Sequence, residues 1–249
     1  MVRRFMEANR KLCFRLAGFF PQAKTDIYAL YNQRVTEYIN LKDNQLVVDV
    51  GGGKSCPFAA NRDPSRGTKI VAVDISLEEL EQNLDVDEKR VADIMRELPF
   101  KDGEVDLLVS RSVLEHLEDI ERFLENSSRV LKQGGHIIHM FPSKYAPFAL
   151  INQILPNSIA RRLLFSIYPD AKGIAGFPAS YDRCYYSAIV SLLAKHGFEL
   201  VDVDLSYYQS HYFAFFLPLF LLSAFYETVV HALGAKNLCA YILLVARKA

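Results

Sequence analysis

The sequence predicts an α/β domain built around a mostly parallel sheet, and three observations lead to this class. Short apolar runs alternate with helical patterns between residues 42 and 129, as they do in consecutive βαβ units. Several of these runs are almost wholly apolar, which is typical of strands covered by helices on both faces. The chain has 249 residues, of which 51% are hydrophobic, and this is enough for one substantial core. We therefore expect residues 1–249 to form a single domain.

The apolar runs define the expected strands. Seven are predicted, over residues 45–50, 69–74, 90–93, 105–110, 136–141, 198–205 and 238–246.

Two helices between the strands have clear signals. Ser76, followed three residues later by Glu79, forms a capping-box pattern that predicts a helix start. Ile120, Phe123 and Leu124 recur at helical spacing and predict a stripe that faces the sheet. We expect the pair Gly134–Gly135 to end that second helix, because glycine tolerates the left-handed cap.

Three segments extend a minimal domain of this class. Residues 1–40 are expected to form a helical N-terminal segment, 142–184 a helical lid-like insertion, and 207–236 an apolar insertion before the last strand. Long excursions in compact domains are often functional. Ligands of open α/β sheets bind beyond the carboxyl ends of the strands, and the insertion at 142–184 leaves from that edge.

The sharpest local signal is the turn after the first predicted strand, where Asp49 precedes Gly51, Gly52 and Gly53. Glycines let the backbone approach a ligand closely. A phosphate-binding GxxxxGK[ST] loop fits poorly because its first glycine would fall on Val48 and the loop would be too short to wrap phosphates. A dinucleotide GxGxxG turn fits less well because Cys56 occupies the third glycine position.

Acidic residues follow the next two predicted strands. Asp74 ends the second strand about twenty residues beyond the glycines, where a carboxylate can accept both ribose hydroxyls. Asp93 ends the third strand. A ligand with an ammonium group, a carboxylate and a ribose, but no phosphates, suits this set of groups.

These patterns, taken together, resemble the class I S-adenosylmethionine-dependent methyltransferases. Five of them occur in the order and spacing of that family: Asp49-x-Gly51-x-Gly53, Asp74, Asp93, the stretch LPFKDGEVD followed by SRSVLEHL, and VLKQGG. Ser55 replaces the third glycine of the family's first motif. The resemblance implies a Rossmann-like, doubly wound, seven-stranded sheet whose last strand is antiparallel.

The resemblance also implies a cofactor, S-adenosylmethionine, and methyl transfer to a small-molecule or lipid-like acceptor. In the family, the acid that corresponds to Asp93 contacts the adenine amino group and the following residue, here Ile94, packs on the ring. Ile75 and Ser110 are the further cofactor contacts that we expect.

Methyl transfer from a sulfonium is an in-line displacement, so positioning supplies much of the catalysis and a base is needed only for a protonated nucleophile. The candidate catalytic residues are His116, His139, Tyr181 and Asp182. Three of them have a structural alternative: His116 could order its loop, His139 could lie in the core, and Asp182 could form an ion pair with Arg183.

Tyr28 and Tyr31 precede the first predicted strand and share one face of a helical stretch. They either cover the cofactor, as a preceding helix often does in the family, or pack in the core.

Composition limits the partners and the setting. Equal numbers of acidic and basic residues, 29 of each, argue against a nucleic-acid partner. The four cysteines have no zinc-ligand spacing, so we expect no metal and a reduced, cytoplasmic protein. Residues 212–226 form a fifteen-residue run without charge, shorter than the roughly twenty residues that span a bilayer.

That run either completes the core or touches lipid. A basic amphipathic stretch over residues 3–19 favours contact with the inner face of the membrane. Two alternative functions stay open at this point: an NAD(P)-linked oxidoreductase, and a methyltransferase-like module that binds without turnover.

Overall fold

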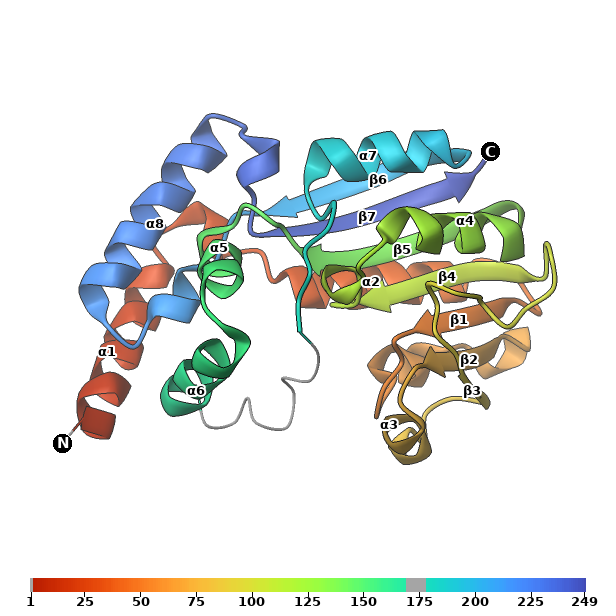
Figure 1. The fold of residues 1–249 in the computed structure, drawn as a ribbon, viewed down its shortest axis with the longest axis horizontal. Helices are drawn as coiled ribbons and strands as arrows, with labels where there is room; N and C mark the ends of the chain where they lie inside the picture. The colour runs from red at the N-terminus through yellow and green to blue at the C-terminus, as the bar shows by residue number, and fades with distance from the viewer. Residues whose placement is uncertain (1, 169–177) are drawn as a thin grey trace.

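The computed structural model describes residues 2–168 and 178–249 and contains the predicted seven-stranded sheet (Figure 1). The strand order is β3-β2-β1-β4-β5-β7-β6. The strands are β1 (Leu46–Val50), β2 (Lys69–Asp74), β3 (Glu88–Val91), β4 (Val105–Arg111), β5 (Leu131–Pro142), β6 (Phe198–Ser206) and β7 (Tyr241–Lys248). Neighbouring strands pair in parallel except for β7, which is antiparallel to both β5 and β6. The predicted fold class is therefore confirmed.

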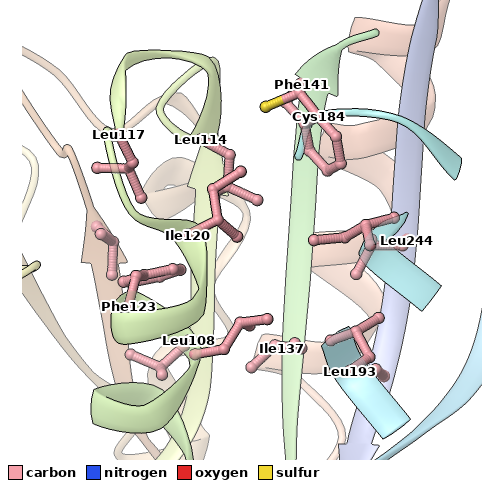
Figure 2. Close-up of a cluster of buried hydrophobic side chains, with 14 of the residues drawn as sticks. Leu108, Leu114, Leu117, Ile120, Phe123, Ile137, Phe141, Cys184, Leu193 and Leu244 are labelled. Atoms are coloured by element: carbon pink, nitrogen blue, oxygen red, sulfur yellow. The ribbon is translucent and has the colours of Figure 1, made fainter. Parts of the chain in front are cut away.

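The central strands are buried on both faces, as their unbroken apolar sequences require. Val48 and Val50 of β1 point into one hydrophobic cluster, and Val47 points into a second cluster on the other face. Figure 2 shows the first cluster, in which Phe123 and Leu193 converge on strand residues such as Ile137. These two side chains come from α4 (Ile120–Val130) and α7 (Tyr186–Lys195). The second cluster is covered by α2 (Ile27–Ile39).

Helix starts follow the local sequence signals. The Ser76 hydroxyl accepts a hydrogen bond from the Glu79 amide at 3.2 Å and caps α3 (Leu77–Gln82). The predicted stripe of α4 is buried as expected. The predicted end of α4 was wrong, because the helix stops at Val130 and the pair Gly134–Gly135 lies inside β5. The glycines fall where the register between β4 and β5 shifts, and Gly134 has a φ of +73° there.

The remaining helices come from the three predicted extensions of the domain. They are α1 (Val2–Ala17), α5 (Pro147–Ile154), α6 (Asn157–Ile167) and α8 (Leu217–Ala232). The predicted lid at 142–184 contains α5 and α6, and its residues 169–177 lie outside the described part of the chain. In Figure 1 these four helices stand beyond the carboxyl ends of the parallel strands. Ligands of such sheets bind at this edge.

None of the helices in the described residues is both long enough and apolar enough to cross a membrane. The uncharged run at 212–226 is divided between a 3₁₀ turn (Ser210–Phe213) and α8. One side of α8 contributes Phe220 to a small core shared with Cys13 and Ala17 of α1.

Candidate functional site

The glycine turn after β1 is held in a tight, defined shape. The Gly51 amide donates to the Val73 carbonyl at 2.7 Å, and Gly51 has a φ of +68°. A Cβ atom on Gly51 would lie 2.3 Å from the Val113 side chain, and one on Gly52 would lie 2.8 Å from Ala72. The turn therefore requires glycine at both positions, for backbone conformation at the first and for space at each.

Asp74 ties this turn to the end of β2. One carboxylate oxygen accepts from the Gly53 amide at 3.0 Å and the other accepts from the Ser76 amide at 2.9 Å. A carboxylate oxygen can accept more than one hydrogen bond, so Asp74 keeps capacity for a ligand hydroxyl. The two elements that the sequence predicted to share a ligand are thus brought together.

Two residues that the sequence reasoning missed fix the far side of the turn. The buried Asn83 side chain donates to the Gly52 carbonyl at 2.9 Å, and Asp85 accepts from the Cys56 amide at 2.8 Å. Both residues lie between α3 and β3, and no local pattern in the sequence links that segment to the turn.

Asp49 lines a small cavity beside the turn. Burial raises the pKa of Asp49 to about 7, while the Cys56 thiol and the Arg111 guanidinium favour its ionised form. The cavity is lined by Tyr31, Asn32, Asp49, Gly51, Ser55, Pro57, Phe58 and Arg111. Within the described residues, the Tyr31 hydroxyl and the side-chain amide oxygen of Asn32 are buried there without a hydrogen-bond partner. Buried polar atoms without partners are costly, and a polar ligand would satisfy them.

These groups fit the amino-acid end of S-adenosylmethionine. A carboxylate suits its ammonium group, while the guanidinium of Arg111 and the phenol of Tyr31 suit its carboxylate. Tyr31 was one of two tyrosines noted in the sequence, and only it lines this cavity, since Tyr28 packs edge-on against Tyr241. Asn32 and Arg111 were not predicted from the sequence. For Arg111 a signal was available, because it is a cation directly at the end of a buried strand.

The other expected cofactor residues occupy different environments. Asp93 lies just beyond β3 and accepts from the Met95 amide at 3.1 Å. Ile75, beside Asp74, is 58% exposed, so it offers an apolar surface to a ligand, whereas Ile94 is buried in the core. Ser110 is fully buried.

Ser110 and His139 form a pair between the sheet and α4. The Ser110 hydroxyl and His139 Nδ1 are 2.7 Å apart, and the His139 ring packs edge-on against Phe123. Burial lowers the pKa of His139 to about 3, so the ring is neutral at physiological pH. Both side chains share the face of Val50, which is opposite to the face of Asp49. This placement favours the core interpretation of His139.

The remaining catalytic candidates lie where the insertion rejoins the fold. His116 Nδ1 is 2.9 Å from the Pro178 carbonyl, and the Tyr181 amide donates to the Glu115 carbonyl at 2.9 Å. Tyr181 is buried with a φ of +51°, and burial chiefly raises its pKa to about 12. Asp182 pairs with Arg183 at 3.3 Å, which was the structural alternative for this residue.

Glu115 is the residue of this region that the sequence reasoning overlooked. It is 5% exposed, and one of its carboxylate oxygens is buried without a partner in the described residues. Burial raises the pKa of Glu115 to about 8. Its charge also contributes to the raised pKa values of Tyr181 and Tyr212, for which burial is the main cause. A lone acid inside the apolar run VLEHL was the available signal.

One cluster has the composition of a metal site. Ligand atoms of Glu121, Glu125 and His196 lie within 4.8 Å of one another. Hydrogen bonds from Lys195 and then Arg183 lower the pKa of Glu121 to about 2. Since cations already neutralise Glu121, we interpret the cluster as an ion-pair network.

Comparison with known proteins gives one family match. Residues 48–139 match the family model described as a methyltransferase domain. Over these residues the chain is similar to a methyltransferase domain. The match begins at the strand that leads into the glycine turn and ends at His139, so it covers Asp49, Asp74 and Asp93 but not the helices of the extensions.

A curated relative and two solved structures extend this result. Sarcosine/dimethylglycine N-methyltransferase of Halorhodospira halochloris is 29% identical over 161 residues, which are 59% of this chain and 54% of that protein. The chain thus spans about half the length of this relative. Geranyl diphosphate C-methyltransferase from Streptomyces coelicolor A3(2), solved with S-adenosyl-L-homocysteine, gives a TM-score of 0.57 at 12% identity, covering 89% of this chain and 81% of that one. The [4+2]-cyclase SpnF gives 0.53 at 17% identity, covering 86% and 80%.

Proposed function

We propose that this protein transfers a methyl group from S-adenosylmethionine to a small-molecule or lipid-like acceptor. The observation that carries the proposal is the set of groups around the glycine turn. Asp49, Asp74 and the Tyr31 hydroxyl, which has no hydrogen-bond partner in the described part of the chain, lie around backbone that requires glycine. The methyltransferase-domain match and the relatives, which include methyltransferases, support the same cofactor.

Each part of the site would hold one part of the cofactor. Asp49, Tyr31 and Arg111 would hold the amino-acid end, Asp74 the ribose hydroxyls, and Asp93 with Ile75 the adenine ring. Bound S-adenosylmethionine supplies an electrophilic methyl group on a sulfonium. The protein then needs chiefly to exclude water and hold the acceptor in line.

Glu115 is our candidate for moving a proton from the acceptor. Its buried carboxyl lies in a 3₁₀ turn (Leu114–His116) just beyond β4, at the ligand-binding edge of the sheet. With a pKa of about 8, its ionised form is a stronger base than an ordinary carboxylate. It would accept a proton from a hydroxyl or ammonium group of the acceptor, which leaves the oxygen or nitrogen free to act as the nucleophile.

The proposed acceptor is apolar over part of its length. Aromatic side chains pack together where the insertion leaves the sheet. Phe148 of α5 stacks on Tyr212, with 4.6 Å between the ring centres, and on Tyr241, with 5.7 Å between the ring centres. The solved neighbours named above include an enzyme of an isoprenoid diphosphate.

We place the protein in the cytoplasm, in contact with the inner face of the membrane.

Calorimetry with S-adenosylhomocysteine tests the cofactor assignment. The wild type should bind saturably, and Asp74→Ala should lose more than about tenfold in affinity because a charge-assisted hydrogen bond is removed. Asp43→Ala is the matched control, since Asp43 is an exposed acid that pairs with the surface residue Arg66. Saturable binding of NADH in place of S-adenosylhomocysteine, by a folded wild type, would instead support the oxidoreductase alternative.

The second candidate function is a module that binds the cofactor without methyl transfer, or that carries out a different reaction, because one structural neighbour is a cyclase. The fold alone does not determine the reaction. If the protein binds S-adenosylhomocysteine but releases no S-adenosylhomocysteine from S-adenosylmethionine with any amphiphilic acceptor, a binding module or a different reaction is favoured.

A further inference from the structure

The outward side of α8 is an uncharged apolar surface. Its exposed large side chains include Leu222 at 65% and Phe225 at 67%, and Leu233 follows the helix at 76%. The one charged residue of α8, Glu227, is fully buried. Extended apolar surfaces of this kind mark interaction sites in proteins that are otherwise monomeric.

The helix is anchored in a way that fixes which side faces outward. The Glu227 carboxylate accepts hydrogen bonds from the Gln209 amide at 3.1 Å, from Ser210 at 3.2 Å and from Ser223 at 3.0 Å. Gln22 donates to Thr228 at 3.0 Å from the segment that follows α1. Because Ser223 and Glu227 are used for this anchoring, the side of α8 that carries Leu222 and Phe225 is left apolar.

The neighbouring helix α1 adds cations to an apolar stripe. Phe5 and Leu12 are exposed and lie seven residues apart, which is close to two helical turns, and the exposed Phe19 follows the helix. Arg4 and Lys11 each precede a member of this stripe, and the exposed Arg15 continues the cationic row. The opposite side of α1, with Cys13 and Ala17, packs on α8. The exposed side of α1 therefore combines aromatic and aliphatic groups with a row of positive charge.

We infer that α1 and α8 together form a docking surface for an anionic lipid bilayer. Apolar side chains beside Lys and Arg are the pattern with which helices lie at the membrane interface. A second copy of the chain fits less well, since a two-fold contact through this surface would bring the two cationic rows to the same interface. This docking surface determines where the protein is located, and it does not require that the acceptor be a lipid.

The position of the surface gives it a role. Figure 1 shows α1 and α8 at the end of the molecule beyond the carboxyl ends of the parallel strands, where α5 and α6 also lie. A bilayer on this surface would face the same end of the fold as the proposed acceptor site. A membrane-resident acceptor could then reach the site without crossing bulk water.

Vesicle flotation of the full chain tests the inference. The wild type should float with vesicles of phosphatidylcholine containing phosphatidylglycerol, and much less with pure phosphatidylcholine. Leu222→Glu with Phe225→Glu should abolish flotation, because both side chains are exposed and the new charges would enter the apolar interface. The matched control is Leu84→Glu with Val201→Glu, which adds two charges at exposed apolar sites outside α1 and α8 and should float like the wild type.

The cationic row is tested separately. Changing Arg4, Lys11 and Arg15 to Ala should weaken binding to the anionic vesicles by about fivefold for each cation removed. Each variant is used only if its S-adenosylhomocysteine affinity and circular dichroism match the wild type.

Two results overturn the inference. One is absence of wild-type flotation on both vesicle types, or flotation that the α8 variant does not reduce. The other is a wild-type dimer, seen by analytical ultracentrifugation, that the α8 variant dissociates, since that would make the surface a self-association interface.

Discussion

The cofactor edge, around β1, β2 and the glycine turn, is built differently from the acceptor edge, around Glu115 and the helices of the extensions. In the first, the glycine turn, Asp49 and Asp74 lie on two consecutive strands and their turns, and Asp74 bonds directly to the Gly53 amide, while α2 and β4 add Tyr31 and Arg111. In the second, Glu115, Tyr181, Tyr212 and Phe148 come from four segments spread over about a hundred residues. A motif can therefore describe the cofactor edge, whereas only the folded chain assembles the acceptor edge.

The largest effect should come from Gly51→Ala, which breaks the cofactor edge. The new methyl would meet Val113 at 2.3 Å and would also strain a φ of +68°. We expect S-adenosylhomocysteine binding to be lost by calorimetry and the free energy of unfolding to fall by roughly 2–4 kcal/mol.

Gly103→Ala is the matched control for that experiment. Gly103 has a φ of +62° but nothing within 4 Å of an added Cβ, so it isolates the backbone strain, which costs about 1–2 kcal/mol. Its cofactor affinity should be unchanged. Equal loss of affinity in both variants would mean that the glycine turn has no special role.

The second largest effect should come from Glu115→Gln, which alters the acceptor edge and leaves the cofactor edge intact. Turnover should fall on the order of a hundredfold, as for loss of a general base, while S-adenosylhomocysteine affinity changes by less than about twofold. Glu118→Gln, an exposed acid three residues away, is the control and should leave both quantities unchanged. Unaltered turnover in the Glu115 variant, measured across pH 6–9, would remove Glu115 from the proposed reaction.

Chemical denaturation gives a readout of Glu115 that is independent of turnover. Its folded pKa of about 8 lies above the ordinary value of 4.5, so its ionisation opposes folding. The associated stability is present below about pH 4.5 and is lost as the pH rises through 8. Glu115→Gln should therefore stabilise the protein relative to wild type by roughly 1–3 kcal/mol more at pH 9 than at pH 5.

The difference between the edges also explains what the sequence could predict. The strands and the residues Asp49, Asp74 and Asp93 followed from apolar runs that end in acids, a pattern that is local in sequence, whereas the arrangement of the sheet was implied only by the family resemblance. Asn83 and Arg111 escaped because their roles depend on hydrogen bonds and a cavity formed by segments that are distant in the sequence. Gly134–Gly135 was misjudged because a strand irregularity and a helix end use the same left-handed glycine.

The third largest effect concerns Asp49, whose ionisation should change the affinity for S-adenosylhomocysteine by about tenfold. Its pKa of about 7 means that the free site is largely protonated at pH 6 and largely ionised at pH 8. An ammonium group binds the ionised form, so S-adenosylhomocysteine affinity should rise across this range. Asp49→Asn should bind more weakly and without this rise, while Asp43→Asn should follow the wild type. A pH-independent affinity in the wild type would show that Asp49 does not meet the ammonium group.

The smallest effect on activity should come from His139→Leu, which tests where the boundary of the site lies. With a pKa of about 3, the His139 ring is too weak a base to take a proton from an acceptor near neutral pH, and it faces α4 rather than Asp49. Leucine preserves most of the buried volume but leaves the Ser110 hydroxyl without its 2.7 Å partner. We expect a loss of stability of about 1–3 kcal/mol and turnover per folded molecule within about twofold of wild type. A hundredfold loss of turnover in folded protein would place His139 in the chemistry, and the acceptor would then approach from the α4 side of the sheet.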